Sequence, residues 1–211
     1  MKRVLIVDDH SVVRNGLKKI LEDQPDEIAF GEAETASEAI AFVHEQDWDL
    51  VILDISLGGG RNGLDTLKEM KQIRPRLRVL ILTMHAEEQY ARRAFKAGAA
   101  GYVTKDSPRA ELLEAIKRIL GGAKYISPAL AEKLIEYIDN DTALSAHEIL
   151  SDREFQVLRL IASGKTVTEI AELLSLSDKT ISTYRARILE KMRMKTNAEL
   201  TYYAIRNRLV D

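Results

Sequence analysis

The chain has 211 residues, 45% of them hydrophobic and 30% charged, which is typical of a globular protein with one large or two small domains. Cysteine is absent, which excludes disulfides, thiolate metal sites and cysteine nucleophiles and agrees with a reducing compartment. The first apolar run ends at Asp8, and no segment reaches the about 20 apolar residues of a membrane span. We therefore expect a soluble, cytoplasmic protein without a membrane partner.

The net charge of −2 combines two parts of opposite sign. Residues 1–150 carry 20 Lys and Arg against 25 Asp and Glu, a net charge of −5, whereas residues 151–211 carry 11 against 8, a net charge of +3. Six of these eleven bases lie between Lys179 and Lys195. An acidic front part and a basic stripe near the end indicate two separate tasks on one chain.

The first part alternates short apolar runs with segments in which apolar residues recur every three to four positions. The runs predict five strands, at 3–8, 28–34, 49–54, 78–83 and 101–105. The segments between and after them predict helices at 12–21, 36–46, 64–73, 87–98 and 108–120. Strands that are apolar on both faces and alternate with helices predict a parallel sheet covered on both sides. We expect a doubly wound, flavodoxin-like α/β domain with a five-stranded parallel sheet.

The strand signal disappears after Gly121 and Gly122. The stretch SPALAEKLIEYI, residues 127–138, predicts one helix with Ser127 as its cap and Pro128 at its first position. The stretch DNDTALSAHE, residues 139–148, has the composition of a linker. The boundaries that we predict are 1–121 for the α/β domain, 122–147 for a linker with one helix, and 148–211 for a further domain.

That further domain is predicted to be small and all-α, because its sequence contains only helical signals. Three of its helices begin with an S/T-x-x-E capping box, in which a hydroxyl and a glutamate reciprocally accept backbone N–H groups. These boxes are Ser151–Glu154, Thr166–Glu169 and Thr196–Glu199. A tight turn before Ser177 separates the second helix from the third.

Carboxylates follow two strands of the predicted sheet. In an open parallel sheet, ligands collect beyond the carboxyl ends of the strands where strand order reverses, here between the first and third strands. Asp8 and Asp9 end the first strand and Asp54 ends the third, so three carboxylates are expected in one crevice. Like charges this close are costly unless a cation lies among them, and all-oxygen ligation suits Mg²⁺.

A hydroxyl and an ammonium group are expected at the same edge. Thr83 ends the fourth strand and Lys105 follows the fifth. Aimed at a metal-bound carboxylate, they would complete a site for an incoming phosphoryl group, with the central Asp54 as nucleophile and Asp8 and Asp9 as metal holders. Each residue alone is more often an ordinary cap or turn residue, but all of them at one edge favour the phosphoryl site.

Four motifs at these strand ends resemble the receiver domain of bacterial response regulators over roughly residues 2–121. The motifs are VDDH (7–10), LVILDISL (50–57), LILTMH (80–85) and GAAGYVTKD (98–106). The resemblance implies that Asp54 accepts a phosphoryl group from a sensor histidine kinase. It also implies Mg²⁺ on Asp9, Asp54 and the backbone carbonyl of Ser56, assisted by Asp8.

The same resemblance implies roles for three residues beside the acceptor. Thr83 and Tyr102 would be a coupled switch pair, and Lys105 would bind the phosphoryl oxygens. On its own terms Tyr102 is ambiguous, since an aromatic residue in a strand is more often part of the core.

The loop after Asp54 departs from the family pattern. Receiver domains commonly have proline four residues after the acceptor, where this chain has Gly58, and the glycine usual at eight residues falls at nine, as Gly63. Met84 also stands where the family usually has a small residue. We interpret Gly58-Gly59-Gly60 as a tolerated insertion. The alternative is a loop that opens Asp54 to water and shortens the phosphorylated lifetime.

The segment SDKTISTYRARILEKM, residues 177–192, predicts a helix with two different faces. Ile181, Tyr184, Ile188 and Met192 share an apolar face. We expect this face to pack on Leu158, Ile170, Leu173 and Leu174. The residues that we predict to contact DNA are Lys179, Thr180, Ser182, Thr183, Arg185, Arg187 and Lys191. Arg187 can read guanine in the major groove, while its Lys and Thr neighbours can bind phosphates. A solvated helix face is the alternative.

Residues 150–208 resemble the LuxR-type helix-turn-helix, whose last helix, here NAELTYYAIRNRL, pairs two copies on DNA. A receiver followed by a LuxR-type tail is the NarL/FixJ class of response regulators. The resemblance implies that phosphorylation switches dimerisation or domain release and thereby controls sequence-specific binding to double-stranded DNA and transcription. RNA polymerase is a further candidate partner.

Other functions compete with this one, and we predict no enzyme. An aspartyl-phosphate phosphatase of the haloacid dehalogenase type needs a second Asp two residues after the nucleophile, where this chain has Ser56. A metal-dependent hydrolase needs a general base, and only His10 and His85 are at hand. A phosphorylation-independent DNA-binding regulator, whose receiver serves only for dimerisation, stays open because of the altered loop.

Overall fold

The computed structural model describes residues 1–24, 27–57, 62–84, 88–132, 146–207 and 209–210. The chain divides into two compact units, residues 1–136 and 137–211. In the part that the structure describes, no helix is both long and apolar enough to span a membrane.

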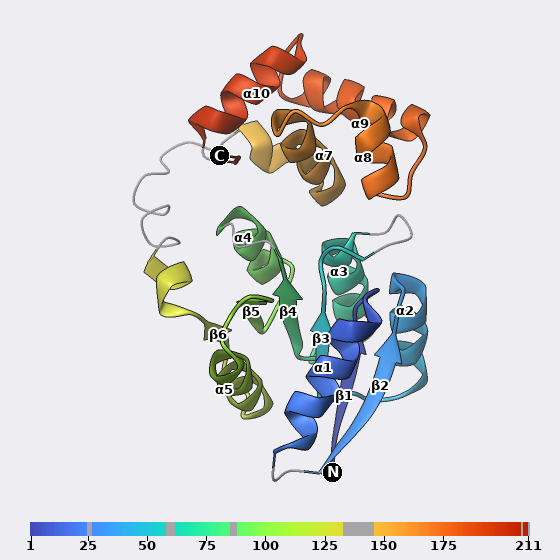
Figure 1. Ribbon diagram of the computed structural model, residues 1–211, viewed down its shortest axis with the longest axis vertical. Helices are drawn as coiled ribbons and strands as arrows, with labels where there is room; N and C mark the ends of the chain where they lie inside the picture. Colours follow the sequence, from blue (N-terminus) through green and yellow to red (C-terminus); the bar gives the residue numbers. More distant parts are fainter. Residues whose placement is uncertain (25–26, 58–61, 85–87, 133–145, 208, 211) are drawn as a thin grey trace. The chain divides into compact units, whose positions relative to one another are not determined.

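The first unit is built on one parallel sheet in the order β2-β1-β3-β4-β5-β6 (Figure 1). Its strands are β1 (Lys2–Val7), β2 (Ile28–Ala33), β3 (Leu50–Leu53), β4 (Val79–Thr83), β5 (Gly101–Thr104) and β6 (Tyr125–Ile126). Its helices are α1 (Ser11–Glu22), α2 (Ala36–Glu45), α3 (Gly63–Ile73), α4 (Glu88–Lys96) and α5 (Arg109–Leu120). The predicted doubly wound, flavodoxin-like sheet is confirmed.

The sheet has six strands rather than the predicted five, because β6 was missed. Tyr125 and Ile126 pair in parallel with Gly101 and Tyr102 of β5, and the N–H of Tyr125 donates to the carbonyl of Ala100 at 2.9 Å. A strand of two residues is too short to show a period in the sequence. The sheet therefore extends into the segment that we predicted as linker.

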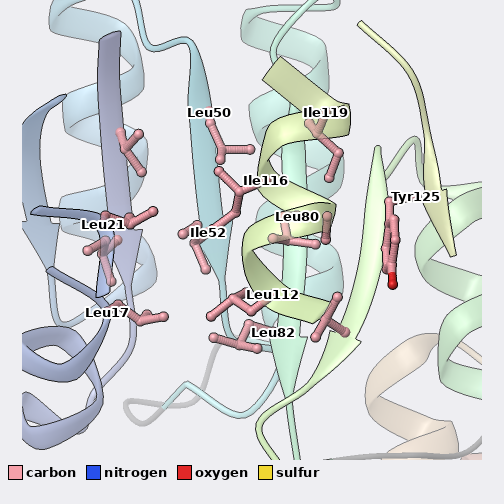
Figure 2. Close-up of a cluster of buried hydrophobic side chains, with 14 residues drawn as sticks. Leu17, Leu21, Leu50, Ile52, Leu80, Leu82, Leu112, Ile116, Ile119 and Tyr125 are labelled. Carbon is pink, nitrogen blue, oxygen red and sulfur yellow. The ribbon is translucent and has the colours of Figure 1, made fainter. Parts of the chain in front are cut away.

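Helices α1 and α5 cover one face of the sheet, as Figure 2 shows for the buried side chains between them. This cluster consists of Val4, Ile6, Leu17, Leu21, Leu50, Ile52, Leu80, Leu82, Val103, Leu112, Ala115, Ile116, Ile119 and Tyr125. The alternate strand residues, such as Val51 and Leu53, are also buried, and α2, α3 and α4 lie over that second face (Figure 1). Burial on both faces explains why the inner strands β3 and β4, which are buried at every position, are almost entirely apolar.

The second unit is helical. It contains the 3₁₀ helix η1 (Ala146–Ile149) and the helices α7 (Asp152–Ala162), α8 (Val167–Leu173), α9 (Asp178–Lys191) and α10 (Asn197–Arg206). Helix α7 packs against α8, α9 and α10. The core between these helices includes the fully buried residues Phe155, Leu158, Ile170, Ile181, Ile188 and Leu200. The predicted small all-α unit is confirmed.

Two of the three predicted capping boxes form, Ser151–Glu154 and Thr166–Glu169. The third is incomplete. Thr196 Oγ1 accepts the N–H of Glu199 at 3.2 Å, but the Glu199 carboxylate accepts the N–H of Lys195 at 2.9 Å. The one-residue shift keeps one more backbone donor satisfied, so the helix start is still capped.

Ser127 caps the helix that follows β6, as predicted. Its Oγ accepts the N–H of Leu130 at 3.3 Å, and residues 128–132 are helical. The rest of the predicted helix and residues 139–145 of the predicted linker lie outside the described residues.

A side chain at Gly101 would disturb the contact between β5 and β6. A Cβ atom there would lie 2.7 Å from Cδ1 of Ile119 and 3.1 Å from the carbonyl oxygen of Tyr125. We expect Gly101→Ala to lower the free energy of unfolding by about 1–3 kcal/mol, because the packed core cannot move away without strain. Urea denaturation measures this.

Gly16→Ala is the matched control. Gly16 lies inside α1, and a Cβ atom there would meet nothing within 4 Å. Alanine should raise the free energy of unfolding by roughly 0.5–1 kcal/mol at this helical position. Equal effects of the two substitutions would show that β6 does not pack as closely as described.

Candidate functional site

Polar side chains from four strands lie at the carboxyl edge of the sheet. Asp8 follows β1, Asp54 follows β3, Thr83 ends β4 and Lys105 follows β5. Strands β1 and β3 are neighbours in the sheet although β2 lies between them in the chain. This reversal of strand order lets the loops after β1 and β3 diverge and leaves a crevice between them.

Lys105 joins the two buried carboxylates of this edge. Its Nζ lies 2.7 Å from Oδ2 of Asp54 and 2.6 Å from Oδ2 of Asp8, and both aspartate side chains are only 3% exposed. Burial by itself lowers the pKa of Lys105, but the hydrogen bonds to Asp54 and Asp8 and their charges raise it more, so the net shift is upward. Lys105 is therefore an ammonium ion at neutral pH.

Asp9 and His10 extend this group toward the surface. Nδ1 of His10 lies 2.7 Å from Oδ1 of Asp9 and 3.2 Å from Oδ1 of Asp8. Potential ligand atoms of these three residues all lie within 4.8 Å of one another. The sequence indicated His10 only as a candidate base of a hydrolase, although its position directly after two aspartates is a signal for this place in the site. We call Asp8, Asp9, Asp54 and Lys105 the carboxylate site.

The carboxylate site fits a hard divalent cation. Asp8, Asp9 and His10 bring potential ligand atoms together, the two carboxylates are ligands that Mg²⁺ prefers, and the exposed side of Asp9 leaves room for the waters that this ion keeps. Asp54 as a further metal ligand stays a prediction. The N–H of Ser56 donates to Oδ1 of Asp54 at 3.0 Å, which orients that carboxylate. The predicted role of the Ser56 carbonyl as a metal ligand stays a prediction.

Thr83 and Tyr102 are both almost completely buried. Tyr102 pairs with Ile81 of β4 on one side and with Ile126 of β6 on the other. The N–H of Lys105 donates to the carbonyl of Thr83 at 2.8 Å, so the two strand ends that carry the hydroxyl and the ammonium are fixed to each other. Both residues are buried on neighbouring strands, and their role as a switch stays a prediction.

The Gly58-Gly59-Gly60 stretch lies outside the described residues, but the chain beyond it returns to Asp54. The N–H of Gly63 donates to the carbonyl of Ile55 at 3.0 Å. A Cβ atom on Gly63 would lie 2.6 Å from Cα of Ile55, so only glycine permits this approach. Gly63 thus begins α3 directly against the backbone of the carboxylate site, despite the longer loop.

In the helical unit, α8, a tight turn and α9 form the predicted helix-turn-helix. Ser175 in the turn has a positive φ of 51°. Ile181, Ile188 and Met192 of α9 are buried as predicted. Of their predicted packing partners, Leu158, Ile170 and Leu174 are buried, whereas the prediction for Leu173 is wrong because Leu173 is 60% exposed.

The predicted DNA-contacting residues differ in their surroundings. Exposed members are Lys179, Ser182, Thr183, Arg187 and Lys191, whereas Thr180 and Arg185 are half-buried. Nε of Arg185 donates to Oδ1 of Asn197 at 2.6 Å, which holds the guanidinium against the start of α10. Their contact with DNA stays a prediction.

Lys191 has a partner that the sequence did not reveal. Its Nζ lies 2.7 Å from Oε2 of Glu154, a side chain that is only 4% exposed. Burial raises the pKa of Glu154, but the hydrogen bonds from Lys191 and Ser151 lower it more, so the net shift is downward. Part of the basic stripe thus neutralises a carboxylate of the same unit, which weakens the case for Lys191 as a DNA contact.

Comparison with known proteins assigns both units. Residues 4–117 match the response regulator receiver domain, and residues 148–204 match the luxR family of bacterial regulatory proteins. The chain belongs to the NarL/FixJ class of response regulators. This response regulator is 35% identical to the response regulator GacA of Pseudomonas viridiflava over 212 residues, which cover 100% of this chain and 99% of GacA.

Two further similarities extend over nearly the whole response regulator. The response regulator UvrY of Escherichia coli (strain K12) is 34% identical, with 100% of this chain and 97% of UvrY covered. RcsB from Salmonella enterica serovar Typhimurium, solved bound to promoter P1flhDC with the phosphomimetic BeF3-, is 28% identical with a TM-score of 0.61. That similarity covers 96% of this chain and 97% of RcsB.

Substitution of Lys105 tests the electrostatics of the carboxylate site. Lys105→Met leaves Asp8 and Asp54 buried without their shared cation, so we expect the free energy of unfolding to fall by about 3 kcal/mol at pH 7. Without the lysine ammonium the two carboxylates repel each other, and protonation at low pH removes this repulsion, so the loss should shrink as the pH falls toward 4. Urea denaturation at both pH values, with and without Mg²⁺, measures the effect.

Lys18→Met is a suitable control, because Lys18 forms an ion pair with Glu32 at the surface. Such a pair contributes about 0–1 kcal/mol. A loss at Lys105 that is equally large at pH 7 and pH 4 would contradict the ion bridge.

Proposed function

We propose that this response regulator is a phosphorylation-switched transcription regulator, in which a sensor histidine kinase phosphorylates Asp54 and thereby controls sequence-specific binding to double-stranded DNA. The observation that carries the proposal is the bridge of Lys105 between Asp8 and Asp54. It assembles an acceptor, a metal-holding acid and a phosphate-binding cation from three strand ends, in a chain that also carries a LuxR-type unit.

At the carboxylate site, Asp8, Asp9, Asp54 and the carbonyl of Ser56 would hold Mg²⁺, which neutralises charge on the transferred oxygens. An oxygen of Asp54 forms the new O–P bond while the N–P bond of the kinase phosphohistidine breaks, and the imidazole nitrogen takes the electron pair. Lys105, now bound to Asp54, exchanges this contact for the phosphoryl oxygens. The protein is the acceptor in this step rather than an enzyme.

The change then passes to buried residues beside the acceptor. The hydroxyl of Thr83 turns toward the phosphoryl group, and Tyr102 follows into the space that Thr83 leaves. Because Tyr102 lies between β4 and β6 in the sheet, its movement can alter the packing of the segment that leads to the linker. The receiver would thereby favour a dimer, release the helical unit, or do both.

The helical unit supplies the DNA contacts and a second pairing surface. In α9, Lys179, Ser182, Thr183 and Arg187 form one exposed face that suits the major groove. In α10, Tyr202 is 69% exposed and Ile205 is 54% exposed, and these apolar side chains suit contact with a second copy. A homodimer would then read two half-sites, and RNA polymerase is a further candidate partner.

The proposed boundaries of the receiver and the linker are residues 121 and 147. Strand β6 and the rest of the compact unit of residues 1–136 lie beyond the first of these boundaries. DNA as ligand and a kinase as phosphodonor place this function in the cytoplasm.

Sedimentation velocity tests the proposal. The wild-type protein with Mg²⁺ and beryllofluoride, which mimics the phosphoryl group, should form a dimer, whereas Mg²⁺ alone should leave it monomeric. Asp54→Ala should stay monomeric under both conditions. A dimer in every sample would favour the regulator whose receiver serves only for dimerisation.

If no dimer forms, ¹⁹F NMR shows whether beryllofluoride has bound to the protein. Binding without dimerisation would assign the switch to release of the helical unit. No binding to the wild type would show that Asp54 is not a phosphoryl acceptor.

Arg187→Ala tests the DNA-reading face. If Arg187 reads a base, the substitution should weaken binding to a cognate site by about 1–3 kcal/mol and leave binding to unrelated DNA nearly unchanged. Lys191→Met is the contrasting variant, because it removes the partner of the buried Glu154. It should lower the free energy of unfolding of the helical unit and leave the ratio of its affinities for the two DNAs nearly unchanged. Fluorescence anisotropy with both DNAs measures these effects, and equal losses on both DNAs for Arg187→Ala would exclude base reading.

A further inference from the structure

The proposed function leaves Arg14 of α1 without a role. Its side chain is buried, with the whole residue only 6% exposed. Removing a guanidinium from water is costly unless its donors are satisfied, so a buried arginine needs specific partners. The partners of Arg14 connect it to the carboxylate site.

Three nitrogens of the guanidinium are engaged. Nη1 donates to the backbone carbonyl of Asp8 at 2.7 Å, Nε donates to Oε2 of Glu32 at 3.3 Å, and Nη2 pairs with the carboxylate of Glu34. Glu32 lies in β2 and Glu34 directly follows it. Lys18, one turn further along α1, pairs with the other oxygen of Glu32 at 2.6 Å. Arg14 thus ties the turn between β1 and α1 to the end of β2.

The carbonyl that Arg14 holds belongs to the peptide bond between Asp8 and Asp9. Rotation of this peptide would change the direction of the Asp9 side chain relative to Asp8. Further bonds hold other parts of the turn: the N–H of Asp8 donates to the carbonyl of Ala33 at 3.2 Å, the N–H of His10 donates to Oδ1 of Asp8 at 2.9 Å, and Nδ1 of His10 lies 2.7 Å from Oδ1 of Asp9. The bond from Arg14 acts on the carbonyl of the Asp8–Asp9 peptide itself. The bond from Arg14 therefore restrains the peptide that sets the angle between the two acids.

We propose that Arg14 is a positioning residue for the cation site: it holds the Asp8–Asp9 peptide so that both carboxylates face one Mg²⁺ ion. The inference rests on the proposed function, because it assumes that the carboxylate site binds Mg²⁺. Mg²⁺ requires near-ideal octahedral geometry, so ligand direction matters more for it than for a flexible ion such as Ca²⁺. Groups behind metal ligands typically change affinity about 10–100-fold.

Charge and geometry predict opposite effects at this position. Arg14 is a cation beside a cation site, so if it acted only through its charge, its removal would strengthen Mg²⁺ binding. If it acts by holding the peptide, its removal weakens Mg²⁺ binding. The direction of the change therefore distinguishes a positioning role from a purely electrostatic one.

Isothermal titration calorimetry with Mg²⁺ and the full-length chain makes this measurement. Arg14→Met, which keeps an apolar stem of similar length, should raise the Mg²⁺ dissociation constant about tenfold. Arg14→Lys keeps the charge but has no planar fork, and its dissociation constant should fall between those of Arg14→Met and the wild type.

Lys18→Met is the matched control. It removes a positive charge from the same network and the same helix, but Lys18 contacts Glu32 rather than the Asp8 carbonyl. Its dissociation constant should equal that of the wild type or be slightly lower. Urea denaturation of each variant without Mg²⁺ separates loss of folding from loss of binding.

Mg²⁺ binding by Arg14→Met that equals or exceeds wild-type binding would overturn the inference and leave the proposed function intact. If Arg14→Met does not fold, Arg14→Lys decides: weaker binding than the wild type supports the positioning role, and equal binding overturns it. Failure of the wild type to bind Mg²⁺, with or without beryllofluoride, would overturn the proposed function and this inference together.

Discussion

The bridge of Lys105 between Asp8 and Asp54 is the interaction on which the carboxylate site of the first unit depends. Two nearly buried carboxylates at one sheet edge repel each other, and the lysine ammonium between them offsets this repulsion. A divalent cation and a phosphoryl group would together replace the contacts of Lys105 with the two carboxylates. The carboxylates of the bridge can thus bind a cation, and its ammonium group can bind the negatively charged phosphoryl oxygens.

Backbone restraints hold this bridge in place from behind. Ser56 orients the Asp54 carboxylate, Gly63 lets α3 begin against the same strand end, and Arg14 binds the carbonyl of Asp8. Ser56, Gly63 and Arg14, which supply these restraints, are not among the residues proposed to bind the phosphoryl group. The chemistry of the site lies in a few side chains, whereas its geometry is distributed over β2, α1 and α3.

Some basic residues of the helical unit bind partners within that unit, and others lie on its exposed surface. Lys191 neutralises the buried Glu154 and Arg185 is held by Asn197, while Lys179 and Arg187 remain on the exposed face of α9. The ion pair of Lys191 with Glu154 therefore lowers the positive charge available to DNA, whereas Arg185 keeps its charge because Asn197 is neutral. The narrower face of Lys179, Ser182, Thr183 and Arg187 is the better description of the candidate interface.

The sequence by itself determined the alternation of strands and helices, the residues at the strand ends and the two-face pattern of α9, because these follow from local periodicity and chain order. Only the tertiary structure decided the sixth strand, since two residues show no period, and the outward position of Leu173. It alone also revealed the partners of Arg14 and Lys191, because Glu34 and Glu154 are distant in sequence and only folding brings such charges together.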